Sequence, residues 1–576
     1  YLRAEQLAVA IPILREIVRA HPRSDVAEFA ANLLLDSYNR LQQFDQLVAF
    51  ANELANDPSF LRDRDDLADV VRTIQGQAAR RHAETLERAA HESKELDQYA
   101  LAGAAYLAIY NANPEATDND EVLYNAGVCF EDGRSIGVAI QMYSLLKKYY
   151  PNSKITARAT ARLGKAFGDI AFYDRAAEEL EKYAAKYAGE KDAHDAMSDA
   201  VFYRKGLGDD AKAIEDTKYY IRTFGTKKPA EAANAHFSLV SIYEKQGDKE
   251  AVIKHLREYI RSHGGKGGAD KRVIAHAKIG QILFEQSCPV KQVDGSCVKI
   301  TRERAVVTKK VKKKKGKEVY TPPKQCGPDS HIKLTVVKRD AGKLRQALTE
   351  FAAAGKDFGK VSEKDDNAAG ARYYYALGKN YEADVEFEKY LDIKFPENLN
   401  FGDGLPENKK KNEELTKKSK KRFEDWLASK GKSAESANKK YESVLGIKDN
   451  ANSIAAAARL GQITQNFADQ LFTAEIPKDV RASKMIDGYD IAQDKVDAYC
   501  DALTTAAEPL AEKSLAAYGI CLSKSTELGW FSEWSKLCER ELGQIKPEEY
   551  PTASELRGDS DLTAPVIAIE PPAKLD

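Results

Sequence analysis

A small residue recurs at one fixed interval through the first half of the chain, and this repeat restricts the fold more than any other feature. Pro114 and Pro151 close two of the units, and bulky residues follow each small one at helical spacing. A period of this length is the signature of a repeat array, in which each unit packs only on its neighbours. The alanines, each separated from the next by 37 residues (139 − 102 = 37), are Ala102, Ala139, Ala176 and Ala213.

Each repeat is predicted to be a pair of antiparallel helices. Gly127 and Gly164 come 12 residues before two of the alanines (139 − 127 = 12). Two helices approach closely only where small residues lie at their crossing, so we expect Gly127 to face Ala139 and Gly164 to face Ala176. Proline then ends the second helix because it cannot continue the backbone hydrogen bonds. The chain has only 19 prolines and 35 glycines among 576 residues, which leaves room for long helices.

This order of small, small, aromatic and proline residues resembles the tetratricopeptide repeat. Gly127, Ala139, Tyr143 and Pro151 match four consensus positions of that family in one unit. The period is about three residues longer than the usual 34 of the family. The resemblance implies an all-α, right-handed solenoid of helical hairpins, a fold whose members bind other proteins.

The resemblance covers roughly residues 1–263. Upstream, Ala10, Leu14 and Pro22 match a second helix, so Tyr1 falls inside a first helix that we expect to begin before it. A long polar helix near residues 62–95 interrupts the register.

The composition changes after this array. Residues 298–307 favour a β-strand, and Ile332, Leu334 and Val336 alternate as a second strand would. Helical patterns then return. We expect four segments, which are a tetratricopeptide-like solenoid at 1–280, a small β insert with cysteines and a lysine-rich hairpin at 281–340, an irregular helical-repeat continuation at 341–545, and an extended proline-containing tail at 546–576.

Six of the seven cysteines cluster outside the regular repeats. The three in the insert lack the closely paired spacing that a zinc site needs, so no metal is expected. A disulfide from Cys288 or Cys297 to Cys326 would staple a sheet that has no core of its own, and free thiols are the alternative. The cluster supports the hypothesis of an oxidising compartment. The second cluster, which could supply another bridge, consists of Cys500, Cys521 and Cys538.

A run of lysines lies between the two expected strands. It has two interpretations: a solvated hairpin tip, or an anchor for an anionic surface such as lipopolysaccharide, polysaccharide or the acidic face of a partner. Nucleic acid is not expected as a partner, because the run has no interleaved aromatic residues and the net charge of the chain is −1. The lysines are Lys309, Lys310, Lys312, Lys313, Lys314, Lys315 and Lys317.

The sequence contains none of the common catalytic or cofactor-binding motifs, so we expect no enzyme, no catalytic residue and no cofactor. Solenoids instead offer a groove lined by first helices, where aromatic anchors beside charged groups suit an extended or helical peptide. The same positions could equally line a groove without a ligand. The inward-facing candidates are Tyr124, Val128, Arg158, Lys165, Asp195, Phe202, Asn234 and Phe237.

The second half resembles large tetratricopeptide proteins of the cell envelope of myxobacteria and their relatives. The segments that carry this resemblance are SCPV…GSC…CGP, LFTAEIPKDVR (471–481), AYCDALT (498–504) and WFSEWSKLCEREL (530–542). It implies a periplasmic or envelope location and a scaffold role in an envelope complex, and some such proteins serve gliding motility. The alternatives are a self-assembling fibre, ring or motility-machinery subunit, a non-catalytic part of a larger enzyme, and a cytoplasmic location. No run of 18 apolar residues exists, so no transmembrane segment is expected.

Overall fold

The computed structural model describes residues 6–62, 65–304, 323–327, 330–486 and 489–551. The chain divides into two compact units, Tyr1–Ile242 (unit 1) and Tyr243–Asp576 (unit 2), and each is described by itself. Tyr1, the lysines at 309–317, the end of the expected first strand (305–307) and most of the expected tail lie outside the described residues.

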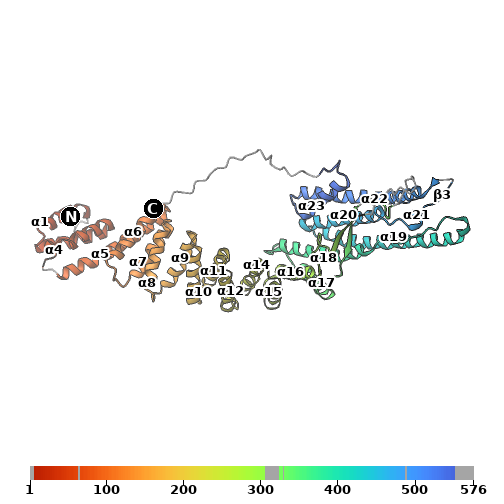
Figure 1. Ribbon diagram of the computed structural model, residues 1–576. Coiled ribbons are helices and arrows are strands. Elements are labelled where there is room, and N and C mark those ends of the chain that lie inside the picture. Colours follow the sequence, from red (N-terminus) through yellow and green to blue (C-terminus); the bar gives the residue numbers. More distant parts are fainter. Residues whose placement is uncertain (1–5, 63–64, 305–322, 328–329, 487–488, 552–576) are drawn as a thin grey trace, which may run out of the picture. The chain divides into compact units, whose positions relative to one another are not determined.

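Unit 1 is a succession of antiparallel helical hairpins (Figure 1). A long helix, α5, takes the place where the sequence predicted a break in the register. The helix α14 (Val240–Lys245) spans the boundary between the units. The remaining helices of unit 1 are α1 (Leu7–Ala20), α2 (Asp25–Arg40), α3 (Phe44–Ala55), α4 (Pro58–Leu61), α5 (Asp65–Ser93), α6 (Leu96–Ala112), α7 (Asn119–Asp132), α8 (Ile136–Tyr149), α9 (Thr156–Asp169), α10 (Tyr173–Lys186), α11 (Ala193–Leu207), α12 (Asp210–Phe224) and α13 (Pro229–Ser238).

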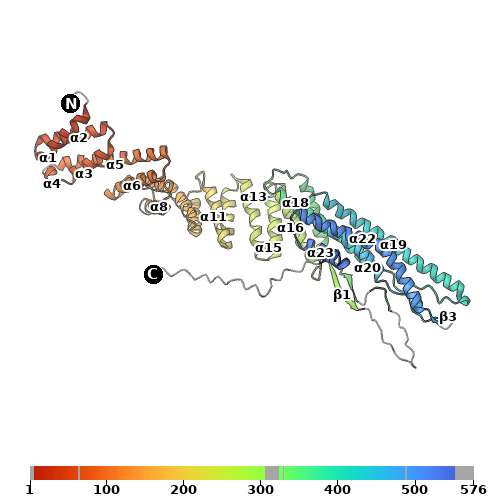
Figure 2. The same cartoon turned by 90° about the horizontal axis from the view of Figure 1, so that it is seen from above.

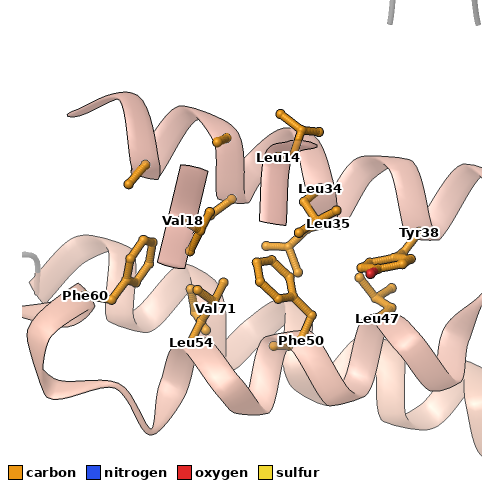
Figure 3. Close-up of a cluster of buried hydrophobic side chains, with 14 of the residues drawn as sticks. Leu14, Val18, Leu34, Leu35, Tyr38, Leu47, Phe50, Leu54, Phe60 and Val71 are labelled. Carbon is orange, nitrogen blue, oxygen red and sulfur yellow. The ribbon is translucent and has the colours of Figure 1, made fainter. Parts of the chain in front are cut away.

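Apolar side chains spaced three and four residues apart hold these hairpins together. In Figure 3, Val18 of α1, Leu35 of α2 and Phe50 of α3 point into one cluster between the helices. The rings of Tyr38 and Phe50 lie 6.3 Å apart in a tilted arrangement. The core of unit 1 is therefore a row of such clusters between neighbouring helices, as expected for a repeat array.

The nearest neighbours of the repeat glycines are large residues of the second helix. The ring of Tyr143 lies directly over Gly127, and the side chain of Leu180 lies over Gly164 in the next unit. Both large residues come 16 positions after their glycine, one helical turn beyond the alanine (143 − 127 = 16). The glycine gives space to the bulky position of the second helix, and Ala139 and Ala176 are buried beside it.

The turns inside the hairpins follow the same period. Arg134, Ala171 and Gly208, spaced by 37 residues, have backbone φ angles of +61°, +63° and +77°. This left-handed conformation reverses the chain at the end of a helix, and glycine adopts it without a steric cost. Among these three turns, only the one at Gly208 has glycine at the position with positive φ.

Unit 2 is built from longer helices with a small β insert at one side of them (Figures 1 and 2). Its elements are α15 (Lys249–Ser262), α16 (Ala269–Ser287), β1 (Val298–Arg304), β2 (Ser330–Val336), α17 (Ala341–Phe358), α18 (Ala368–Asp392), η2 (Pro406–Asn408), α19 (Lys409–Leu445), α20 (Asn450–Phe472), α21 (Lys478–Arg481), β3 (Met485–Ile486), β4 (Tyr489–Asp490), α22 (Ala492–Glu527) and α23 (Glu533–Ile545).

Glycines again receive large side chains where these helices cross. Phe351 of α17 lies between Gly280 of α16 and Gly378 of α18, and Tyr518 of α22 lies over Gly461 of α20. The described part of the segment 341–545 is mainly helical, apart from the short strands β3 and β4, and its helices of irregular length use the same packing device as unit 1.

The β insert is an antiparallel hairpin in which Val298 pairs with Val336 and Arg304 pairs with Ser330. Glu388 of α18 attaches it to the helices. Its carboxylate accepts two hydrogen bonds from Arg339, at 2.7 and 2.8 Å, and a third at 2.7 Å from the backbone N–H of Cys297. These groups are buried, so the paired charges fix where the insert lies on the helices.

The six clustered cysteines form three disulfides, and the expected bridge from Cys288 or Cys297 to Cys326 is wrong. Cys288 pairs with Cys297, because the chain between them reverses at Asp294 and Gly295 and returns to the end of α16. The remaining disulfides are Cys326–Cys500 and Cys521–Cys538.

Cys326 does not reach Cys288 or Cys297 because its backbone pairs with the segment at 474–476. The N–H of Cys326 donates to the carbonyl oxygen of Ala474 at 2.9 Å, and Ile476 donates to Lys324 at 2.9 Å. This pairing places Cys326 beside α22, which carries Cys500.

The chain therefore has an all-α, tetratricopeptide-like fold of helical hairpins with a small cysteine-containing β insert. Among the described residues, no helix combines the length and the apolar character needed to cross a membrane.

Candidate partner-binding face

The first helices of three hairpins present equivalent positions at intervals of 37 residues. Val128 of α7, Lys165 of α9 and Phe202 of α11 share one position of the repeat (165 − 128 = 37). Arg158 and Asp195 share another, about two turns earlier on the same side of their helices. We call the surface formed by the exposed and half-buried residues of α7, α9 and α11 the first-helix face. The register of the repeat thus brings five of the eight predicted groove residues into corresponding places.

The α9 part of this face is basic. Arg158 and Lys165 are both exposed, seven residues apart on one side of the helix, and neither forms an ion pair within the described part of the chain. Between them, Arg162 donates to Glu131 at 2.9 Å, and the same carboxylate accepts a hydrogen bond from Tyr143 at 2.8 Å. Burial, followed by the charge of Glu131, raises the pKa of Tyr143. The preceding hairpin, α7–α8, therefore holds Arg162 in place, whereas Arg158 and Lys165 are available to an acidic ligand.

The α11 part of the face combines aromatic and acidic side chains. Phe202 is 72% exposed although it is large and apolar. Its ring meets Tyr203 edge-on at 5.9 Å, and Tyr203 stacks on Tyr173 of α10 at 5.2 Å. Phe172 is exposed beside Tyr173 in the chain, at the turn between α9 and α10. These four residues form what we call the aromatic cluster.

Acidic residues flank the aromatic cluster on α11. Asp195 contacts His194 at 3.0 Å and is otherwise exposed. Partial burial, together with the neighbouring Asp195, raises the pKa of Asp199. The face therefore carries carboxylates on α11 and, on α9, two cations that form no ion pair within the described residues.

A buried arginine fixes α11 against α10. Arg204 donates from Nε to Glu181 at 2.6 Å and from Nη1 to Asp174 at 2.8 Å. The nearby Asp216 of α12 has its pKa raised to about 7 by burial and by the charge of Glu181. Because Arg204 is two residues beyond Phe202, these bonds hold the helix that presents the aromatic side chain.

The other predicted groove residues contribute less to a continuous surface. Tyr124 and Val128 of α7 are half-buried, and the ring of Tyr124 packs against Tyr143 with centroids 6.2 Å apart. On α13, Asn234 is exposed and Phe237 is half-buried. The shorter α13 does not keep the 37-residue register, so these two residues have no counterpart at the positions of Asp195 and Phe202.

Sequence reasoning missed Phe172, Tyr173 and Tyr203. A signal was present, because two consecutive aromatic residues follow directly on the turn at Ala171, where a polar residue would be expected on a solvent-exposed hairpin.

Comparisons with known proteins yield no family model and no curated protein that matches this chain. Solved structures do match. BtubC (BKLC) from P. vanneervenii is 18% identical over 39% of this chain and 91% of its own, with a TM-score of 0.20. The Rap protein complexed with competence and sporulation factor is 13% identical over 73% of this chain and 99% of its own, with a TM-score of 0.20.

The tetratricopeptide domain of P58(IPK) is 12% identical over 82% of this chain and 97% of its own, with a TM-score of 0.18. The three structures share little overall similarity with this chain, as their TM-scores of 0.18 to 0.20 show. Within the described residues no group of three or more histidine, cysteine or acidic side chains could hold a metal ion.

Proposed function

We propose that this protein is a non-catalytic scaffold that binds a segment of a partner protein on the first-helix face of unit 1. The observation that carries the proposal is the alignment of Lys165 and Phe202 in one repeat position, with an unpaired cation on one helix and an exposed aromatic ring on the next. Exposed apolar side chains that lie together, as Phe202 does with the aromatic cluster, mark interaction sites when they form a contiguous patch. Aromatic anchors beside charged groups are the usual centre of such sites.

The chemistry of the face specifies the kind of partner segment. An acidic side chain of the partner would meet Arg158 and Lys165, and an apolar side chain would pack on Phe202 and the aromatic cluster. A helix or an extended strand can offer both at the spacing of neighbouring helices. Asp195 and Asp199 would in turn oppose a second acidic group and so select against uniformly acidic segments.

We further propose that the scaffold works in an exported complex of the cell envelope. The support is the three disulfides, which form and persist in oxidising compartments. All the clustered cysteines are paired, and the free thiol of Cys129 is buried in a hairpin core.

A photo-crosslinking amino acid placed at position 165 or 202 in cells tests the proposal. We expect both positions to capture one recurring partner protein. With the crosslinker at position 202, we expect the charge reversals R158E and K165E to abolish the capture. The matched control is the pair K212E and K218E, which makes the same charge change on the second helix α12. Equal capture by both double variants, or capture from position 212 alone, would show that the first-helix face is not the binding surface.

A second candidate function is self-assembly of the chain. Val9 and Ile13 of α1, together with Val26 and Phe29 of α2, are exposed large apolar residues on two neighbouring helices. Such a face could pack against another copy end to end. Crosslinks that join only copies of this chain would favour this candidate over the scaffold, and sedimentation at two concentrations would detect the assembly directly.

A further inference from the structure

The turn between α22 and α23 exposes three large apolar side chains within four consecutive residues. Leu528 is 40% exposed, Trp530 is 45% exposed and Phe531 is 69% exposed. We call residues 528–532 the α22–α23 tip. It belongs to unit 2, whereas the first-helix face belongs to unit 1. Contiguous exposed apolar groups of this size mark a surface that leaves water on binding.

The backbone of the tip has little need of water. The N–H groups of Leu528, Gly529 and Trp530 donate to carbonyl oxygens of α22 at 3.0, 3.2 and 2.9 Å. The N–H of Ser532 donates to the hydroxyl of Ser535 at 2.6 Å. Four of the five N–H groups of residues 528–532 are thus paired with other described residues, and that of Phe531 is not among them. An unsatisfied N–H is costly in an apolar medium, so a turn with most of its donors paired internally can enter one at lower cost.

The tip is also held in one conformation. The disulfide Cys521–Cys538 ties the end of α22 to α23, and both of its cysteines are fully buried. Ser532 and Ser535 form a reciprocal capping box at the start of α23. Gly529 supplies the positive φ of +60° that the reversal requires. A surface that is already ordered loses little conformational entropy when it binds.

The area and charge of the tip indicate what covers it. The exposed parts of the three side chains amount to roughly 300 Å². A stable protein–protein interface needs about 800 Å² on each partner, so this tip alone is too small for one. The charged residues nearest to the tip in the sequence form ion pairs within their own helices, Lys524 with Glu527 at 2.5 Å and Lys536 with Glu533 at 3.0 Å. A small, neutral, apolar protrusion with a tryptophan fits the interfacial layer of a lipid bilayer.

We propose that the α22–α23 tip inserts into the interfacial layer of a lipid bilayer and so attaches unit 2 peripherally to a membrane surface. Its apolar side chains would leave water, and the paired charges behind them would stay at the level of the lipid headgroups. The proposal does not depend on the partner-binding role of unit 1.

Flotation of the full chain with vesicles of phosphatidylcholine tests the proposal. We expect the chain to float with the vesicles, and the double variant W530S with F531S to partition at least about tenfold less. The matched control is F202S, which removes an aromatic side chain of the same exposure in unit 1 and is expected to leave flotation unchanged. W530F is expected to keep binding and to lose the blue shift of tryptophan emission that accompanies insertion.

Three outcomes would overturn the proposal. The first is absence of the chain from the floated fraction. The second is equal flotation of the chain and the double variant. The third is capture of a partner protein that the double variant loses while neither binds vesicles, since the tip would then enter a protein pocket. Far-ultraviolet circular dichroism of the double variant verifies its fold, and the R158E and K165E variant must float as the unchanged chain does.

Discussion

At the residue scale, Lys430 of α19 is the most unusual side chain of unit 2. It is 0% exposed, and its Nζ donates to the carbonyl oxygens of Tyr390 and Ile393 at 2.8 and 3.1 Å and to Asn466 Oδ1 at 3.0 Å. The same nitrogen lies 3.6 Å from the centroid of the Tyr390 ring. Every partner is neutral. Burial, with a smaller contribution from Lys394, lowers the pKa of Lys430 to about 6.

This pKa makes the stability of unit 2 depend on pH. In the unfolded chain a lysine has a pKa of about 10.4, so the unfolded state binds more protons between that value and about 6. Stability then rises with pH across this window and is lowest below the folded pKa. We expect Lys430 to contribute roughly 3 kcal/mol more to the stability of unit 2 at about pH 9 than at about pH 6.5. Urea unfolding followed by tryptophan fluorescence measures this difference, because Trp426, Trp530 and Trp534 all lie in unit 2.

The variant K430M provides the control for this dependence. Methionine fills a similar volume without an ionisable group, so the difference between the two pH values should shrink by most of its size. An unchanged pH dependence in K430M would assign the effect to another group.

Individual residues of the candidate face were only partly predictable from the sequence. The 37-residue register placed Lys165 and Phe202 at equivalent positions, because a repeat fixes which side of a helix each residue occupies. The register does not reveal which side chains form ion pairs. Only the structure distinguishes Arg158, which forms none within the described residues, from Arg162, which donates to Glu131. Lys430 gave no signal at all, since it lies in a helix segment rich in polar residues.

At the element scale, the contact between Gly127 and Tyr143 determines how close α7 and α8 lie. A methyl group on Gly127 would overlap the tyrosine ring, so the helices would have to separate. We expect G127A to destabilise the α7–α8 hairpin by about 2 kcal/mol. Gly137 of α8 is the matched control, because a Cβ there meets nothing within 4 Å. G137A should stabilise the hairpin by up to about 0.5 kcal/mol through helix propensity.

Hydrogen exchange of the α7 and α8 amides measures both variants. G127A should exchange faster than the unchanged chain in these helices, while G137A should exchange at the same rate or more slowly. Equal exchange in the two variants would contradict the assigned contact.

Helices and strands were the most predictable features at this scale, and their connections were the least. The alternation of Ile332, Leu334 and Val336 predicted β2 because a strand has a period of two. Disulfide pairing depends instead on where loops turn in space. The reversal at Asp294 and Gly295 and the pairing of Cys326 with Ala474 are contacts that no local pattern contains.

At the scale of the whole molecule, the interactions that stabilise unit 1 internally differ from those that stabilise unit 2. Unit 1 relies on a row of similar hairpin cores, and its only cysteine is the free Cys129. Burial raises the pKa of this thiol to about 12, so it is unreactive in the folded chain. Unit 2 has helices of unequal length and contains all three disulfides. The repeat period predicted the first arrangement, but the second has no period from which it could be predicted.

This contrast predicts that reduction weakens unit 2 and leaves unit 1 unchanged. The disulfide Cys326–Cys500 spans 174 residues, and in the chain-entropy account a loop of that length contributes on the order of 5 kcal/mol. Reductant should therefore lower the urea midpoint reported by tryptophan fluorescence, while hydrogen exchange in α7 to α12 stays the same. The accompanying control is alkylation of the unfolded chain without reductant, which should label one thiol out of seven. Labelling of all seven thiols in protein isolated from its native compartment would contradict the proposed oxidising location. An unshifted urea midpoint would show that the disulfides do not stabilise unit 2.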